Sequence, residues 1–185
     1  MELKEVLRAR RSARQFVPKP IADGVLEEIL SYAPWVPNHH VTEPWRFIVV
    51  KDHSLHELAR LRYQAVLRKR QGQPTAQARA ERAEREFVES AAVIVVVQAV
   101  DPDPVRRQED YAATVMATYN IFLVAWDYGI ASYWHTGPLT TDDEVRAWLG
   151  LSASETPVAF VRLGYPAQIG VSTRTPAASR TRWLR

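Results

Sequence analysis

The most constraining feature of the sequence is an uninterrupted apolar run, AVIVVVQA, over residues Ala92–Ala99. A strand with one face in water alternates apolar and polar residues, whereas a run that is apolar on both faces must be buried on both. Other elements then have to cover each face. The run therefore predicts a strand in the middle of a sheet, with helices packed on either side of it.

Three further segments predict the remaining strands: Trp45–Val50, Ile130–Trp134 and Pro157–Leu163. Each is short and rich in β-branched or aromatic residues, and we expect the first of them, WRFIVV, to be buried. Helical patterns separate these strands, and the sequence contains no repeat and no internal linker. A length of 185 residues suits one domain. We therefore expect a single domain of α/β or α+β class over residues 1–185.

Six segments have the apolar spacing or the capping residues of helices. They are Glu2–Arg10, a helix opened by Asp23, one from the box Ser54–Glu57 to about Arg70, Thr75–Glu89, Asp110–Tyr128, and one from the box Thr141–Glu144 to Gly150. In each box, a hydroxyl and a carboxylate three residues apart can satisfy backbone amides reciprocally.

Two of these segments and the chain end carry further expectations. Thr75–Glu89 is so highly charged that an exposed helix and a mobile flap remain alternatives. The long helix closed by Gly129 is apolar on nearly all sides, which predicts burial or a place in a subunit interface. From Gly164 onward the chain is polar and aperiodic, and we expect it to wrap over another surface.

The residues and motifs that the chain lacks exclude several classes of function. Without cysteine it cannot form disulfides, a thiolate nucleophile, a cysteine zinc site or an iron–sulfur cluster. The motifs GxGxxG, GxxxxGK, GxSxG and HExxH are also absent. No apolar run reaches the length of a signal peptide or the roughly 20 residues of a membrane helix, so we expect a soluble cytoplasmic protein. The net charge of +3 fits nucleic acid or a phosphorylated cofactor equally.

Histidine occurs in two groups that could in principle bind a metal ion. His53 and His56 lie at a helix start, and His39 and His40 could join Glu43. Histidines on a surface helix are more often solvated, and adjacent residues seldom converge on one ion. We therefore expect no metal site.

Three polar clusters carry the residues best suited to bind an anionic ligand. Arg10–Arg14, RRSAR, offers three guanidiniums and a hydroxyl, and the planar fork of arginine matches phosphate oxygens. The same charges also suit a solvated helix end. Pro37–Phe47, PNHHVTEPWRF, is a donor-rich loop before a strand. Trp134–Leu139, WHTGPL, follows a strand end, where ligands of α/β sheets gather.

These clusters, in this order, resemble the nitroreductase family. The motif RRSxRxF, the loop Pro37-Asn38-His39 with Pro44-Trp45, and the later Trp134-x-Thr136-Gly137 are closest to its small bacterial members, and the resemblance covers essentially the whole chain. It implies an α+β fold with a mixed sheet flanked by helices. It also implies a homodimer that has the long helix in its interface and two FMN molecules at that interface.

The resemblance assigns roles to the arginine-rich segment. Arg10 would bind the FMN phosphate, with Ser12 adding a hydrogen bond nearby. Arg11 would lie along the ribityl chain, and Arg14 would approach the N1–C2=O edge of the ring.

The other cofactor-binding residues that the resemblance implies come from the later clusters and the tail. Asn38 and His39 would reach the FMN of the partner subunit, and backbone amides near N5 would come from the strand end. The full set is Asn38, His39, Trp134, His135, Thr136, Gly137 and Arg174. Larger members carry Pro-x-Glu-Gly where this chain has His135-Thr136-Gly137, which leaves the pocket shape and the substrate open.

The implied chemistry needs no catalytic side chain, because the flavin performs the redox step. NADH or NADPH would donate hydride, and nitroaromatics, quinones or similar flat electron-poor compounds would accept electrons by a ping-pong mechanism. Other flavin reactions on the same fold, such as dehalogenation, flavin cleavage or enal reduction, stay open. So does an FMN-binding storage or sensor protein, while a nucleic-acid binder lacks any recognised motif.

Overall fold

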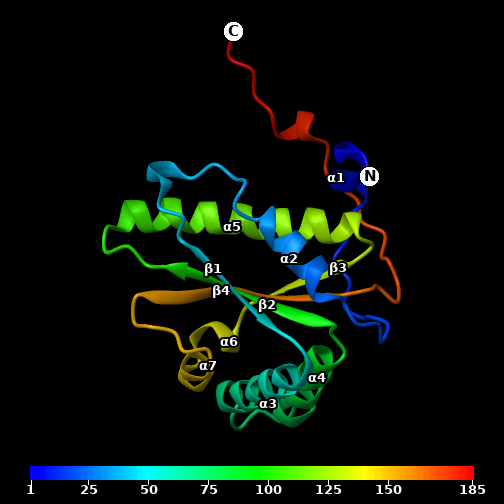
Figure 1. The fold of residues 1–185 in the computed structure, drawn as a ribbon, viewed down its shortest axis with the longest axis vertical. Helices are drawn as coiled ribbons and strands as arrows, with labels where there is room; N and C mark the ends of the chain where they lie inside the picture. Colours follow the sequence, from blue (N-terminus) through cyan, green and yellow to red (C-terminus); the bar gives the residue numbers. More distant parts are fainter.

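The computed structural model describes residues 1–185 and contains a four-stranded sheet with helices on both faces (Figure 1). The strands are β1 (Trp45–Val50), β2 (Ala92–Ala99), β3 (Ala131–His135) and β4 (Glu155–Gly164). Their order across the sheet is β1-β2-β4-β3, so β2 lies inside the sheet. Its residues are buried up to the last position, which confirms the expectation from its apolar run.

All neighbouring strands in this sheet are antiparallel. The parallel component of the expected mixed sheet is limited to an isolated bridge between Ser12 and Ser132. Helices segregated around an antiparallel sheet define the α+β class, which confirms that prediction. The expected burial of β1 is wrong, because β1 is an edge strand in which Arg46 and Val49 are exposed.

Two helical layers cover the sheet, and β2 contributes to both (Figure 1). On one face, Ile94 and Val96 pack with residues of α2 (Asp23–Ser31) and α5 (Pro104–Asp127). On the other face, Val93, Val95 and Val97 pack with residues of α3, α4, α6 and α7. The bounds of these four helices are Asp52–Lys69, Ala76–Val88, Pro138–Thr141 and Asp143–Trp148.

Helix α5 begins at Pro104, six residues before the predicted start at Asp110. Asp103 sets this start, since its carboxylate accepts hydrogen bonds from the amides of Val105 and Arg106. An aspartate cap followed by proline at the first helical position is a favourable combination. Gly129, with φ of 72°, follows the helix end as predicted.

Neither predicted capping box forms. Helix α3 begins at Asp52, so Ser54 lies inside its first turn and no side chain caps the helix. Helix α7 is capped by Asp142, whose carboxylate accepts a 3.2 Å hydrogen bond from the amide of Val145. Thr141, the predicted cap, instead ends α6.

The charged segment 75–89 forms helix α4 and not a flap. Ala80, Ala83 and Phe87 are buried, and they supply the apolar side by which α4 packs against the body of the protein. None of the helices combines the length and the apolarity that crossing a membrane requires.

The two chain ends lie beyond α5 (Figure 1). Helix α1 (Leu3–Ala9) agrees with the predicted N-terminal helix. Residues 167–185 are exposed. The amide of Ala167 donates to the carbonyl of Gln15 over 3.1 Å, and from residue 171 onward the tail extends away from the sheet, with one short 3-10 turn at Ala177–Arg180. Within one chain, residues 171–185 therefore cover no other surface.

Candidate functional site

The arginine-rich segment and the residues that follow it, together residues 10–17, run along the open edge of the sheet beside β3. The amide of Ala13 donates to the carbonyl of Ser132 over 3.2 Å, beside the bridge that joins Ser12 to Ser132. Farther along, the amide of Val17 donates to the carbonyl of Tyr165. The segment thus extends the sheet edge, and it holds Ser12 and Arg14 with their side chains exposed.

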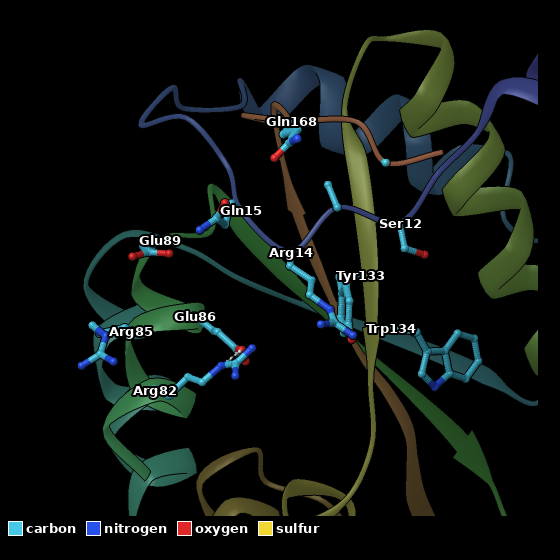
Figure 2. A pocket seen from close by; sticks show the side chains of 12 residues that line it. Ser12, Arg14, Gln15, Arg82, Arg85, Glu86, Glu89, Tyr133, Trp134 and Gln168 are labelled. Carbon is cyan, nitrogen blue, oxygen red and sulfur yellow. Dashed lines mark hydrogen bonds and ion pairs between the residues drawn. The ribbon is translucent and has the colours of Figure 1, made fainter. Parts of the chain in front are cut away.

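A cavity of about 960 Å³ lies between this segment, β3 and α4. Figure 2 shows Ser12, Arg14, Tyr133 and Trp134 on one side of it. On the other side, α4 contributes Arg82, Arg85 and Glu86, and Glu89 follows the end of the helix. The volume falls at the upper end of the range for ligand pockets, about 300–1,000 Å³.

The arginines of the segment have no acidic partner in this chain. The ion pairs of the protein do not include Arg10, Arg11 or Arg14. Arg11 donates to the carbonyls of Arg8 and Arg10 over 2.6 and 2.9 Å. The guanidinium of Arg14 lies 5.7 Å from the centre of the Tyr133 ring.

Arg10 is the best candidate to bind an oxyanion. Its guanidinium lies 5.8 Å from the ring of Tyr119 and 5.9 Å from that of Phe122, both on α5. Its Nε is buried and makes no hydrogen bond. Its Nη groups are not buried and also make no hydrogen bond in the chain, so they are free to donate to a phosphate oxygen.

The strand-end cluster does not act as one group, because neighbouring residues of a strand face opposite sides of the sheet. Trp134 lines the cavity and meets Phe122 of α5 edge to face at 5.9 Å. His135 points to the other layer, where its ring lies 4.6 Å from Tyr133 and 5.4 Å from Phe87. Thr136 is exposed, and Gly137 turns the chain into α6 with φ of 87°.

Sequence reasoning missed a partly buried polar network next to this cavity. Arg62 of α3 donates to Glu86 over 3.1 Å and contacts His135 Nδ1 at 3.3 Å. Arg82 pairs with the other oxygen of Glu86 at 3.1 Å. These residues come from separate elements, so no local motif reveals them. The one available signal was Arg62 itself, a charge beside the apolar residues of its helix.

His135 is held in its neutral form. Burial, with a further contribution from the nearby guanidiniums of Arg62, Arg162 and Arg14, lowers its pKa from 6.5 to about 2. Since Arg62 donates toward Nδ1, the ring proton lies on Nε2, which is buried and has no partner. The unfolded chain protonates this residue below its ordinary pKa, whereas the folded chain does not.

We therefore expect His135 to make the protein less stable as the pH falls below 6.5. Between pH 7 and pH 5 the free energy of unfolding should fall by about 2 kcal/mol more in the native chain than in His135→Gln. Urea denaturation at both pH values measures the difference. Parallel losses in the two proteins would show that His135 titrates normally in the folded state.

The predicted residues of the second loop and the tail lie elsewhere in the chain. Asn38 donates to the hydroxyl of Thr42 over 3.0 Å, and His39 Nδ1 lies 2.9 Å from Glu109 near the start of α5. Arg174 bonds only to Ser172 and Thr173, next to it in the tail. Within one chain, Ser12, Arg14 and Trp134 therefore lie together at the cavity, and Arg10 and Arg11 precede Ser12 in the sequence. Asn38, His39 and Arg174 do not lie at this cavity.

The histidine pair has an acidic neighbour other than the expected Glu43. The possible ligand atoms of His39, His40 and Glu109 lie within 4.8 Å of one another. His39 and His40 are exposed, and the two rings stack at 3.8 Å.

Comparisons with known proteins agree on one family. The sequence model described as the nitroreductase family matches residues 7–165. The chain is 31% identical over 179 residues to "Putative NAD(P)H nitroreductase YfhC" of Bacillus subtilis, covering 96% of this chain and 92% of that protein. A nitroreductase-like family protein from Bacillus cereus superposes with a TM-score of 0.87 at 29% identity, over 100% of this chain and 96% of the other. A Desulfovibrio desulfuricans protein solved in complex with FMN has the same fold, with a TM-score of 0.78 at 21% identity over 100% and 98% of the two chains.

Proposed function

Because the chain belongs to the nitroreductase family, we propose that it is an FMN-dependent oxidoreductase that uses NADH or NADPH. The observation that carries the proposal is the cavity at the β3 edge, where Ser12 and Arg14 lie beside arginines that have no acidic partner. The names of relatives agree with it, since YfhC is named an NAD(P)H nitroreductase and the Desulfovibrio desulfuricans structure contains FMN. We take residues 1–185 as one FMN-binding domain.

The residues present fit an FMN molecule. Arg10 would hold the phosphate, with Arg11 and Ser12 next to it, since its guanidinium has no acceptor and no acidic partner in the chain. Arg14, whose guanidinium lies beside the Tyr133 ring, would place a cation at the N1–C2=O edge and favour negative charge there. The backbone amides of Thr136 and Gly137 would face N5. FMN, when bound, supplies the two-electron redox chemistry.

A homodimer would complete the site. Tyr111, Met116 and Tyr119 leave an apolar face of α5 exposed, each between 38% and 49% accessible. The loop that carries Asn38 and His39 lies beside the start of the same helix. These two residues are far from their own cavity, which agrees with a role at the cavity of the partner, and the extended tail with Arg174 would find its surface there too. Light scattering should give twice the chain mass of 21.1 kDa.

The acceptors we propose are nitroaromatics, quinones and similar flat electron-poor compounds, reduced by a ping-pong mechanism. The cavity offers aromatic surface from Tyr133 and Trp134. Of the two carboxylates that line it, Glu86 is engaged by Arg62 and Arg82. A flavin reaction needs no acid–base pair, because its acceptor is reduced directly at the ring.

The experiment is an anaerobic titration of the FMN-reconstituted protein with NADH and with NADPH. We expect the flavin band, about 450 nm in general flavin chemistry, to bleach and to return when a nitroaromatic or a quinone is added. A protein that cannot be reconstituted with FMN would contradict the proposal. A band that does not bleach would indicate storage or sensing, and one that bleaches but is not restored by these acceptors would indicate another flavin reaction.

A further inference from the structure

Arg162 is a buried arginine without an acidic partner. It lies in β4, is 0% exposed, and forms none of the ion pairs of the chain. Residues before and after it in the strand, Val161 and Leu163, are apolar and buried. Burial lowers the pKa of Arg162 to about 10, which still leaves the guanidinium charged at neutral pH. An unpaired buried charge usually costs a protein stability, so its presence calls for a reason.

The contacts of Arg162 lead to the segment that lines the cavity. Its Nη2 donates to the carbonyl of Arg14 over 3.2 Å, and the guanidinium lies 5.0 Å from the centre of the Phe16 ring. Its Nε donates to the hydroxyl of Ser90 over 2.8 Å, which anchors the group to the body of the protein. Arg162 therefore joins the middle of the sheet to two residues of the segment on either side of Gln15.

The surroundings of Arg162 leave its charge without an ion-pair partner, although the carboxylates of Glu86 and Glu89 lie near enough to raise its pKa. Its register partner on β3 is Tyr133, the residue on which Arg14 stacks. Glu86 forms ion pairs with both Arg62 and Arg82. His135, which lies on the same face of β3 as Tyr133, is neutral. Nη1 of Arg162 is buried without any acceptor. A positive charge thus lies directly behind the segment that presents Ser12 and Arg14 to the cavity.

We propose that Arg162 is a positioning residue of the flavin site, kept although it lowers the stability of the fold. Through the Arg14 carbonyl and the Phe16 ring it fixes the segment that holds Ser12 and Arg14. Its unpaired charge also raises the positive potential at the base of the cavity. The inference rests on the proposed FMN binding.

The decisive variant is Arg162→Met, which keeps much of the side-chain volume and removes the charge. Replacing a buried charge by an apolar group of similar volume is often neutral or stabilising. We expect the flavin-free variant to resist urea at least as well as the native chain. We also expect its dissociation constant for FMN to rise about tenfold, since a charge-assisted contact that orders the segment is lost, and the reduction potential of bound FMN to become more negative.

Two further variants make the outcome specific. Arg68→Met is the matched control, because Arg68 pairs with Asp142 and Glu144 away from the cavity, and its FMN affinity should equal that of the native chain. Arg162→Lys restores the charge but cannot reach both Ser90 and Arg14 with a planar fork. Its reduction potential should return toward the native value, and its FMN affinity should lie between those of the native chain and Arg162→Met.

Two results would overturn the inference. One is an unchanged FMN affinity and potential in Arg162→Met. The other is a loss of stability and of FMN affinity in parallel, without recovery of the potential in Arg162→Lys, as an ordinary structural residue would give. If the native chain itself binds no FMN, the proposed function fails instead, and that result is seen before any variant is made.

Discussion

Replacing Gly164 by alanine should destabilise the protein and weaken FMN binding in one step. A Cβ at this position would lie 2.5 Å from Cγ and 2.8 Å from Cβ of Phe16. These atoms are at the base of a buried ring, so a rotation of the ring cannot clear them. Overpacking of this kind costs about 1–3 kcal/mol. Because Phe16 ends the segment that carries Ser12 and Arg14, its displacement should move the cavity wall as well.

Gly24 provides the matched control for this substitution. It lies in α2, where an added Cβ would meet nothing within 4 Å. Alanine there should leave FMN binding unchanged and should not destabilise the protein, since the added Cβ has open space and alanine favours a helix more than glycine does. Urea denaturation and fluorescence titration with FMN measure both quantities.

A double substitution tests the cause of the effect. Phe16→Ala removes Cγ, which the new Cβ would meet at 2.5 Å, so Gly164→Ala should cost less stability in the Phe16→Ala background than in the native chain. Strictly additive losses in the double variant would mean that Phe16 and the new methyl group do not collide.

The strands could be predicted because each is a compact apolar run between turn residues. All four begin and end within about two residues of the predicted bounds, and the run in β2 also gave its interior position. The same reasoning misplaced β1, since WRFIVV has the composition of a buried strand. Whether a strand lies at an edge depends on its neighbours in space, and its own residues do not record that.

Helix starts were less predictable, since a pattern such as S-x-x-E can occur by chance inside a first turn. That is the case for Ser54 in α3. The start of α5 depends on Asp103, whose carboxylate bonds two amides, although the sequence before Asp110 shows little apolar periodicity. A cap residue identifies a helix start only when its side chain meets the amides, and this geometry is a property of the fold.

Site residues that are close together in the sequence could be predicted. Those brought together only by the fold could not. The segment Arg10–Arg14 stands out by charge alone. That Trp134 and His135 lie on opposite faces of the sheet could have been deduced, since neighbouring residues of a strand point to opposite sides. Arg162 was visible as a lone charge in an apolar strand, yet its contacts with Arg14 and Phe16 come from residues nearly 150 positions earlier.

Arg10→Ala should raise the dissociation constant for FMN by about 10- to 100-fold, as expected for the loss of a charge-assisted phosphate contact of roughly 1.5–3 kcal/mol. Arg10 makes no side-chain hydrogen bond or ion pair in the chain, and its Nε is buried without an acceptor. Its removal therefore leaves no other group without a hydrogen-bond partner, and the stability of the flavin-free protein should change little. Arg8→Ala, on the exposed side of α1, is the control and should bind FMN normally.

Arg11→Ala separates a local phosphate contact from a general effect of charge. Both Arg10→Ala and Arg11→Ala remove one positive charge from adjacent positions, so a long-range field would weaken FMN binding equally in the two, and salt would screen both losses alike. Arg11, however, already donates to the carbonyls of Arg8 and Arg10. We therefore expect a clearly smaller loss of FMN affinity in Arg11→Ala. Equal losses would assign the effect to the overall charge of the segment, and unchanged flavin occupancy in Arg10→Ala would refute the assignment of the phosphate to Arg10.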